Sequence, residues 1–236
     1  QKKIFTPIDE DEKGGASIAI AEADEPFAPH RGELHLVGSG PGGIAFLTAD
    51  ARSALARSIV WVGYSLYLDN LESLLRPDQV RIDSQLTHER ERCEKALDLA
   101  KQGARVALIS SGDSGIYGMA GLALELWLDL KVSERPFFEV HPGLSALQLA
   151  AARLGAPLMH DFCAISLSDH LTPWPLIETR LEAAAKGDFV IAIYNPRSQE
   201  RLWQLNRAIE LMLEYRMPNT PAAVARKVGR ENEKVE

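Results

Sequence analysis

The stretch LHLVGSGPGG, residues 34–43, joins a short apolar run to a loop rich in glycine. An apolar run that ends in such a loop is typical of a buried strand that leads into a helix in an α/β sheet. Gly38, Gly40 and Gly43 have the G-x-G-x-x-G spacing of dinucleotide-binding loops. The spacing leaves three interpretations open: a dinucleotide loop, a loop for another ligand, or a tight turn without a ligand.

Strands and helices are expected to alternate from Glu33 to the end of the chain. Short β-branched or apolar runs predict strands, and segments of helical period lie between them. This alternation predicts an α/β fold with a largely parallel sheet that is covered on both faces. The expected strands are residues 34–37, 59–62, 105–110, 137–140, 163–167, 189–194 and 222–228. The expected helices are residues 48–57, 87–103, 116–128, 144–154, 174–186 and 198–215.

The clearest of these helices is THERERCEKALDLAKQG, residues 87–103. Thr87 can cap its first turn, and Gly103 can end it. An apolar stripe at helical spacing predicts one buried face, formed by Cys93, Ala96, Leu97 and Ala100.

Composition excludes several classes of protein. The chain has 236 residues, 46% of them hydrophobic, and no apolar run approaches the roughly 20 residues of a membrane span. The N-terminal residues lack the apolar core of a secretory signal. Cys93 and Cys163 form no C-x-x-C motif, which favours a reducing, cytoplasmic setting. The net charge of −7 and the lack of a basic stripe disfavour nucleic-acid binding.

Three segments are expected from the change in pattern along the chain. Residues 1–32, rich in acids, glycine and proline, are interpreted as a linker or the tail of an upstream fused domain. Residues 33–156 are predicted to form an N-terminal α/β domain, with a boundary near Ala156. Residues 157–236 are predicted to form a second α/β domain that ends early.

Three loops follow predicted strands: residues 38–43, 110–118 and 141–146. Ligands of open α/β sheets bind at the carboxyl ends of strands, so these loops are the candidate site. A dinucleotide in the first loop is disfavoured, because no acid closes the second predicted strand, where VWVGYSLY (residues 60–67) precedes Asp69. The predicted cap at Thr48 also places the start of the helix several residues after the third glycine. Pro41 also removes one backbone amide. A flavin or nicotinamide oxidoreductase stays as an alternative, and GDSGIYG is either a simple turn or a cradle in which Asp113 meets an ammonium group.

Six motifs, in order, resemble the S-adenosylmethionine-dependent tetrapyrrole methylases of corrin biosynthesis. They are LHLVGSGPGGIAFLTADA, GDSGIYGMA, VHPGLSAL, ISLSDHLTPW, IAIYNPRS and PAAVARKVGR. The resemblance extends from Glu33 to the end and implies two α/β domains, a mostly parallel first sheet, a mixed second sheet and a ligand cleft between them. It also implies a homodimer. Gly42–Gly43 departs from the family's usual G-P-G-D, so a carboxylate role there is not carried over.

The resemblance further implies an activity and a set of site residues. Methyl transfer from S-adenosylmethionine to C17 of precorrin-3B, with ring contraction to precorrin-4, would leave S-adenosylhomocysteine. Methylation of a cobalt-containing substrate, methylation at another ring position and an inactive cofactor-binding scaffold stay as alternatives. By resemblance, the cofactor contacts Gly112, Asp113, Ile116, Tyr117, Ser145, Ala146, Tyr194, Asn195, Ala223 and Val224. The tetrapyrrole is then expected beside Gly38, Gly40, Pro41 and Gly42 of the glycine loop.

The chemistry requires alignment rather than a protein nucleophile, because a sulfonium methyl group is already electrophilic. Asp169 and His170, which follow a predicted strand, are the candidates for proton transfer, and Trp174 offers a flat surface for the macrocycle. The substrate's carboxylates call for arginines, and Arg90, Arg92, Arg197 and Arg226 are candidates. No metal is expected, because His88–Glu89 does not extend to H-E-x-x-H.

Overall fold

The computed structural model describes residues 3–10, 16–22, 32–85, 88–199 and 201–236 of the chain. Its centre is a five-stranded sheet in the order β5-β4-β6-β3-β7, in which every pairing is parallel. These strands are β3 (Glu33–Gly38), β4 (Val60–Tyr64), β5 (Val80–Ser84), β6 (Arg105–Ser110) and β7 (Phe137–His141).

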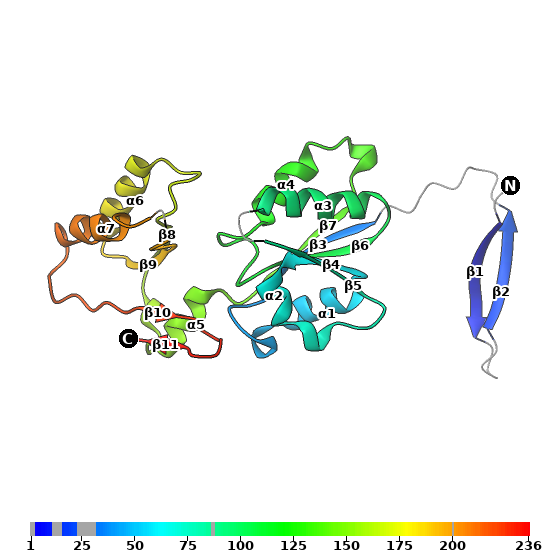
Figure 1. Cartoon of the computed structure of the whole chain (residues 1–236), viewed down its shortest axis with the longest axis horizontal. Coiled ribbons are helices and arrows are strands. Elements are labelled where there is room, and N and C mark those ends of the chain that lie inside the picture. The colour runs from blue at the N-terminus through cyan, green and yellow to red at the C-terminus, as the bar shows by residue number, and fades with distance from the viewer. Residues whose placement is uncertain (1–2, 11–15, 23–31, 86–87, 200) are drawn as a thin grey trace.

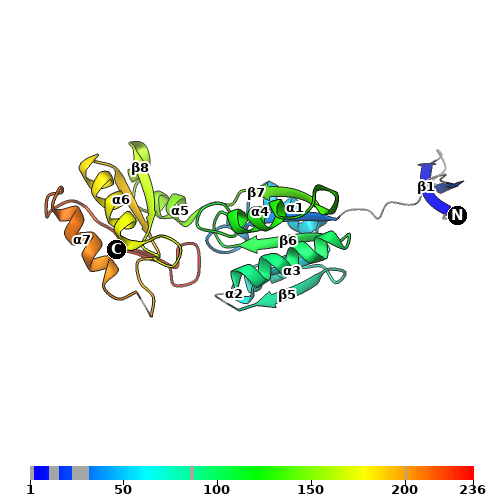
Figure 2. The same cartoon turned by 90° about the horizontal axis from the view of Figure 1, so that it is seen from above.

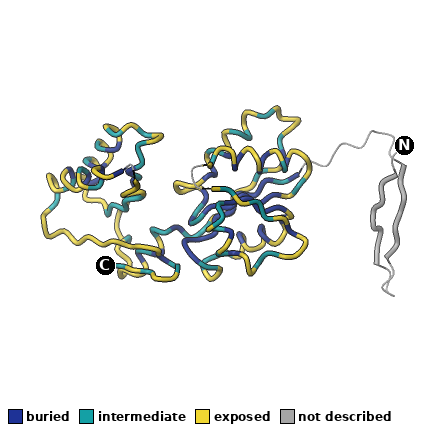
Figure 3. Tube along the Cα trace, in the orientation of Figure 1, coloured by how far each residue is buried: buried dark blue, intermediate teal, exposed yellow. Residues whose placement is uncertain are grey.

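Helices cover both faces of this sheet, as Figure 1 shows. One apolar cluster packs α3 and α4 on β3, β4 and β6, and a second packs α1 and α2 on the opposite face. Burial is concentrated in these central strands (Figure 3). The helices are α1 (Ala49–Arg57), α2 (Ser65–Asp69), α3 (Glu89–Lys101) and α4 (Ala120–Leu128).

The strand order positions the candidate site. β3 lies between β6 and β7, with Gly38 beside Ser110 and Val37 beside His141. Because the strands are parallel, the three loops that follow them leave the same edge of the sheet. Residues far apart in sequence therefore meet there.

A smaller second sheet follows, formed by β8 (Phe162–Ser166) and β9 (Val190–Tyr194). Its two strands are parallel, and α6 (Trp174–Lys186) and α7 (Gln204–Leu213) share an apolar core with them. Figure 2 shows this unit beside the five-stranded sheet, with α5 (Ala146–Arg153) between them. In the described residues this sheet is a parallel pair, not the mixed sheet that was expected.

The second sheet differs from the expected mixed sheet because of the C-terminal segment. The strand expected at residues 222–228 is reduced to β10 (Ala225–Arg226), which pairs with β11 (Lys234–Val235) in a separate antiparallel ribbon. Lys227 and Gly229 have positive φ angles, so the chain turns away there instead of continuing an extended strand.

Within residues 1–32, the structure describes two strands in a segment expected to be a linker or tail. β1 (Lys3–Glu10) and β2 (Ala16–Glu22) pair antiparallel, with an irregularity between Pro7 and Asp9. In ASIAIAE, isoleucine alternates with small residues, which is typical of a strand. The prediction of a linker was therefore wrong for this segment.

The predicted helices agree with the structure where the apolar period is long. The helix at Trp174–Lys186 has the predicted bounds, and Thr48 caps α1 by accepting a hydrogen bond from the Ala51 amide. α3 buries its predicted stripe, but Thr87 lies outside the described residues, and the helix begins at Glu89. None of the helices among the described residues is long and apolar enough to cross a bilayer.

Candidate functional site

Three loops from β3, β6 and β7 form the framework of the candidate site. Gly40 and Gly112 exchange two backbone hydrogen bonds, of 3.1 and 2.8 Å, which join the first loop to the second. Both residues have positive φ angles, of 76° and 69°, which favour glycine. The pairing holds the glycine loop against the GDSGIYG loop.

Asp113 ties the second loop to the third. Its carboxylate accepts one hydrogen bond from the Gly115 amide at 2.8 Å and one from the Gly143 amide at 3.0 Å. A carboxylate that accepts two backbone N–H groups makes stronger bonds than a neutral acceptor would. Asp113 therefore holds the backbone of the second and third loops in position. The ammonium group of a ligand would have to share the carboxylate oxygens with these two amides.

The third loop leads into α5, where Ser145 and Gln148 form a capping box. Tyr194, at the end of β9, accepts a hydrogen bond from the Leu147 amide at 3.1 Å through its hydroxyl oxygen. Its ring lies 5.0 Å from that of Tyr117, whose hydroxyl donates to the Ala164 carbonyl at 2.8 Å. The second sheet thus contacts both expected cofactor loops of the first.

Gly112 lies close to the start of α5. A Cβ placed on Gly112 would lie 3.9 Å from the Ser145 Cα and 4.0 Å from the Ala146 nitrogen, in ordinary van der Waals contact with both. Gly112 and the start of α5 thus face each other across the space of one small group. Ile116 and Tyr117 are exposed on the same loop. The structure thus brings the second loop and the start of α5, both predicted to contact the cofactor, next to each other.

Two further predicted cofactor segments have different surroundings. Asn195 follows Tyr194 with a positive φ of 51°, and its amide donates to the Ser166 hydroxyl at 3.0 Å. Ala223 and Val224 lie in an exposed stretch, where Val224 exchanges two backbone hydrogen bonds with Glu236. Those two bonds hold Val224 to the end of the chain and not to the three loops.

The glycine loop is covered over most of its length. Gly38, Gly40, Pro41 and Gly42 are all buried, and the backbone of Gly229 packs against Gly42. Its accessible part begins at Gly43, which is half-buried, and continues into exposed Ile44. The four residues expected beside the tetrapyrrole are thus mostly inside the protein.

Arg230 contributes to this cover, and its role was missed in the sequence. Its guanidinium donates to the Pro41 carbonyl at 2.9 Å and to the Ser111 hydroxyl at 3.0 Å. One C-terminal side chain therefore joins the first and second loops. The signal was present, because Arg230 ends the motif PAAVARKVGR.

Asp169 and His170 lie on the loop after β8. The Gln204 amide donates to the Asp169 carboxylate at 3.1 Å, and this hydrogen bond, with Arg201 nearby, holds the pKa of Asp169 below its usual range. An ionised carboxylate of this kind is a weak base and a better hydrogen-bond acceptor. Trp174 packs edge to face on Trp203, with ring centroids 4.8 Å apart.

The candidate arginines differ in availability. Arg92 is buried and donates to the Ser84 hydroxyl and the Gln85 carbonyl, so it is a structural residue. Arg90 pairs with Glu94 on the exposed face of α3. Arg197 and Arg226 are exposed.

Comparisons with known proteins agree with this architecture. The tetrapyrrole (corrin/porphyrin) methylase family matches residues 33–236. A probable cobalt-factor III C(17)-methyltransferase of Salmonella typhimurium is 48% identical over 85% of this chain and 82% of its own. A precorrin-3B C(17)-methyltransferase of Sinorhizobium sp is 43% identical over 86% of this chain and 80% of its own. The crystal structure of the methyltransferase CobJ has a TM-score of 0.80 and 35% identity, covering 87% of this chain and 85% of that one.

Longer relatives match as well. The chain covers 38% of the cobalt-factor III methyltransferase of Priestia megaterium, at 45% identity over 87% of this chain. It covers 43% of the cobalamin biosynthesis protein CobIJ of Mycobacterium tuberculosis, at 41% identity over 94% of this chain. The family match, the identity over most of two relatives and the shared fold agree with one another. This chain belongs to the tetrapyrrole (corrin/porphyrin) methylase family.

Proposed function

We propose that this chain transfers a methyl group from S-adenosylmethionine to C17 of precorrin-3B, with ring contraction to precorrin-4, in cobalamin biosynthesis. The observation that carries the proposal is the meeting of the Gly112–Tyr117 loop, the start of α5 and Tyr194 in a member of this family. The position on the ring is supported by relatives whose names specify C17.

The proposed cofactor residues would act by holding two reactants in line. S-adenosylmethionine supplies an electrophilic methyl group when it is bound. Backbone groups of Gly112, Ser145 and Ala146, supported by Asp113, would hold the cofactor in one orientation. Such positioning replaces an encounter in solution and contributes on the order of several kcal/mol to lowering the barrier. Tyr194 and Asn195 would close the site from the second sheet.

Proton transfer during ring contraction is the second task. We propose His170 as the group that exchanges a proton, because an imidazole can both accept and donate near neutral pH. Asp169, held ionised by Gln204, would orient polar groups of the substrate beside it. Exposed Arg197 and Arg226 are the proposed partners of the substrate carboxylates.

The test combines binding with turnover. Calorimetric titration with S-adenosylhomocysteine should show one site per chain, and incubation with S-adenosylmethionine and precorrin-3B should add one methyl group to the product mass. NMR of the methylated carbon should identify C17. Binding of a flavin or nicotinamide, with no binding of S-adenosylhomocysteine, would favour the oxidoreductase. Tight binding without turnover would favour an inactive scaffold.

A second candidate substrate is the cobalt-containing analogue. It is favoured by relatives that are named for cobalt-factor III, at 48%, 45% and 40% identity. Parallel assays with metal-free and cobalt-bound substrates, at matched concentrations, separate the two by their kcat/KM values.

A substitution at Gly43 tests whether the glycine loop contacts the tetrapyrrole rather than the cofactor. A Cβ at Gly43 meets nothing within 4 Å, and its φ of −72° is accessible to any residue. We expect Gly43→Phe to lower kcat/KM for the tetrapyrrole by about 10-fold or more, while the affinity for S-adenosylhomocysteine stays within about 2-fold. Equal losses in both measurements would contradict a substrate-facing role.

Gly40 is less suitable for that purpose. A Cβ there would lie 2.8 Å from the Phe46 carbonyl oxygen, and the residue has a positive φ. Because Gly40 pairs with Gly112, a bulky side chain would disturb the proposed substrate and cofactor loops together. The Gly43 variant separates the two effects.

The remaining proposals concern organisation. We propose a homodimer, a domain boundary near Ala156 and a cytoplasmic location. We also propose that residues 1–32 belong to a fused neighbour, since the match to CobIJ covers 94% of this chain and therefore extends ahead of residue 33. Light scattering of the full chain tests the dimer, and limited proteolysis tests the boundary.

A further inference from the structure

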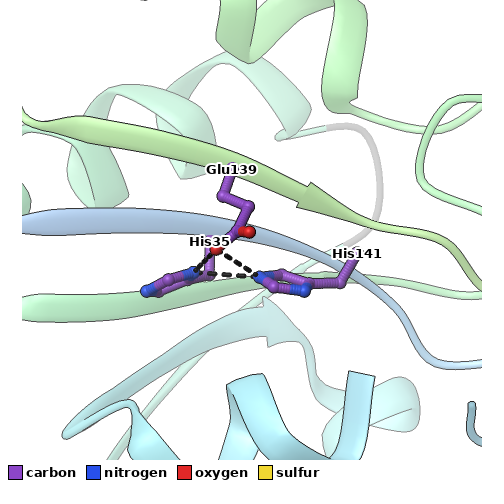
Figure 4. Close-up of side chains that lie close together, drawn as sticks. All are labelled: His35, Glu139 and His141. Atoms are coloured by element: carbon purple, nitrogen blue, oxygen red, sulfur yellow. Dashed lines mark hydrogen bonds and ion pairs between the residues drawn. The ribbon is translucent and has the colours of Figure 1, made fainter. Parts of the chain in front are cut away.

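A cluster of two histidines and a glutamate lies on the face of the five-stranded sheet that α1 covers. His35 comes from the middle of β3, and Glu139 and His141 come from the edge strand β7. The parallel register sets His35 beside Glu139, and the alternation of side chains along a strand places His141 on the same face. Figure 4 shows the three side chains converging on one point.

The spacing of the three nearest ligand atoms suits a metal ion. His35 Nδ1 and His141 Nε2 are 2.9 Å apart, and the Glu139 Oε2 lies 3.5 and 3.4 Å from them. A point about 2 Å from all three atoms therefore exists, and this is the length of a zinc bond to imidazole nitrogen or carboxylate oxygen. Both imidazoles are buried, so their positions are set by the packing of the sheet.

The outer nitrogens of both histidines face carboxylates. His35 Nε2 lies 2.9 Å from the Glu33 carboxylate, which Arg105 also holds at 2.6 and 3.0 Å. His141 Nδ1 lies 2.7 Å from the Asp50 carboxylate in the first turn of α1. An ionised carboxylate only accepts hydrogen bonds, so each outer nitrogen carries a proton and donates it.

The protons on the outer nitrogens determine the state of the inner nitrogens. A neutral imidazole that donates through one nitrogen has a lone pair on the other. His35 Nδ1 and His141 Nε2 then direct lone pairs at each other across 2.9 Å, beside a negative Glu139 oxygen. Such an arrangement is repulsive unless a proton or a metal ion lies among the three atoms.

We propose that His35, Glu139 and His141 bind one divalent transition-metal ion of the zinc type, outside the proposed methyl-transfer site. Two imidazoles and a carboxylate suit zinc and, with open positions, iron(II). Glu33 and Asp50 act as outer partners, which orient the imidazoles and raise their basicity as carboxylates do in known zinc sites.

The cluster borders solvent through Glu139 and lies at the start of the third loop. Glu139 is 45% exposed at its side chain, whereas the two imidazoles are inside. A metal ion can enter past Glu139, and water can complete its coordination. His141 directly precedes Pro142 and Gly143, so the metal would anchor the strand end from which the loop to Ser145 departs.

The experiment measures Zn²⁺ and Co²⁺ binding to the untagged full chain. Competition with a chromophoric chelator should give one Zn²⁺ per chain, and bound Co²⁺ should show the intense visible absorption of four-coordinate cobalt. Glu139→Gln, at an exposed position, should keep the fold and weaken binding by about 10-fold or more. Asp50→Asn leaves all three ligands in place and should weaken binding by about 10-fold.

The matched control is His160→Gln, which removes an exposed histidine outside the cluster and should bind as the parent does. Failure of the parent chain to bind Zn²⁺, with an imidazolium signal for His35 or His141 in nitrogen NMR, would mean that a shared proton fills the position and would overturn the proposal. Equal Zn²⁺ affinity in the parent, Glu139→Gln and Asp50→Asn would overturn it too. Loss of methyl transfer alone leaves these metal measurements unaffected, so the two proposals are tested separately.

Discussion

Gly143→Ala is expected to lower the affinity for S-adenosylhomocysteine by roughly 100-fold, the scale that overpacking costs of about 1–3 kcal/mol produce. A Cβ at Gly143 would lie 2.1 Å from the Gly112 carbonyl oxygen and 2.7 Å from the Gly38 carbonyl carbon. Both neighbours are backbone atoms, so no flexible side chain can move aside. The loops after β3, β6 and β7 would have to separate.

The measurement is a calorimetric titration, accompanied by circular dichroism and thermal unfolding to show that the chain still folds. The matched control is Gly121→Ala in α4, where a Cβ meets nothing within 4 Å. Gly121 is the second residue of α4, and alanine has the higher helix propensity, so this variant should keep its affinity and lose no stability. An unchanged affinity in Gly143→Ala would contradict the proposed position of the cofactor.

Asp113→Ala is the second variant with a large expected effect, a loss of S-adenosylhomocysteine affinity between about 10-fold and 1000-fold. The substitution removes two hydrogen bonds to a carboxylate, each worth on the order of 1.5–3 kcal/mol. One of these hydrogen bonds holds the Gly143 amide of the third loop, and the other holds the turn at Gly115 in the second loop. Both are needed to hold the second and third loops together.

Asp113→Asn should have an intermediate effect, because its single amide oxygen can accept in place of only one of the two carboxylate oxygens. Hydrogen exchange gives an independent readout, since the Gly143 amide should exchange faster in Asp113→Ala. Asp98→Ala, at an exposed carboxylate on α3, is the control and should change neither measurement. Slow exchange at Gly143 in Asp113→Ala would show that the carboxylate does not hold the third loop.

Local structure was predictable where one pattern dominates. The strand at Arg105–Ser110 and the helix at Trp174–Lys186 have the predicted bounds, because each has a long apolar period with clear ends. The helix expected at 198–215 begins only at Gln204.

β5 (Val80–Ser84) was not predicted from the sequence. It is an edge strand whose Arg81 and Asp83 pair with each other and whose Val80 is exposed, so it lacks the apolar run of the inner strands. β5 is stabilised by its pairing with β4. The residues within β5 do not reveal this pairing, because it depends on a segment elsewhere in the chain.

The candidate site was predictable in its parts. Glycine-rich loops after strands were predicted as the candidate site, and the strand order brings those loops to one edge of the sheet. The sequence did not show which residues of the glycine loop are accessible to a ligand. Pro41 and Gly42 are covered by the C-terminal segment around Gly229 and Arg230, which contacts them from almost 190 residues away in sequence.

Apolar patterning along the chain is enough to predict the alternation of strands and helices, the parallel first sheet and the strand ends where the loops meet. These features follow from apolar periodicity and turn residues, which act over a few neighbouring positions. The pairing of Gly40 with Gly112, the hydrogen bonds of Arg230 to two loops and the contact of His35 with His141 arise only when the chain folds. Those contacts depend on which strands lie side by side, and packing of the whole sheet selects that order.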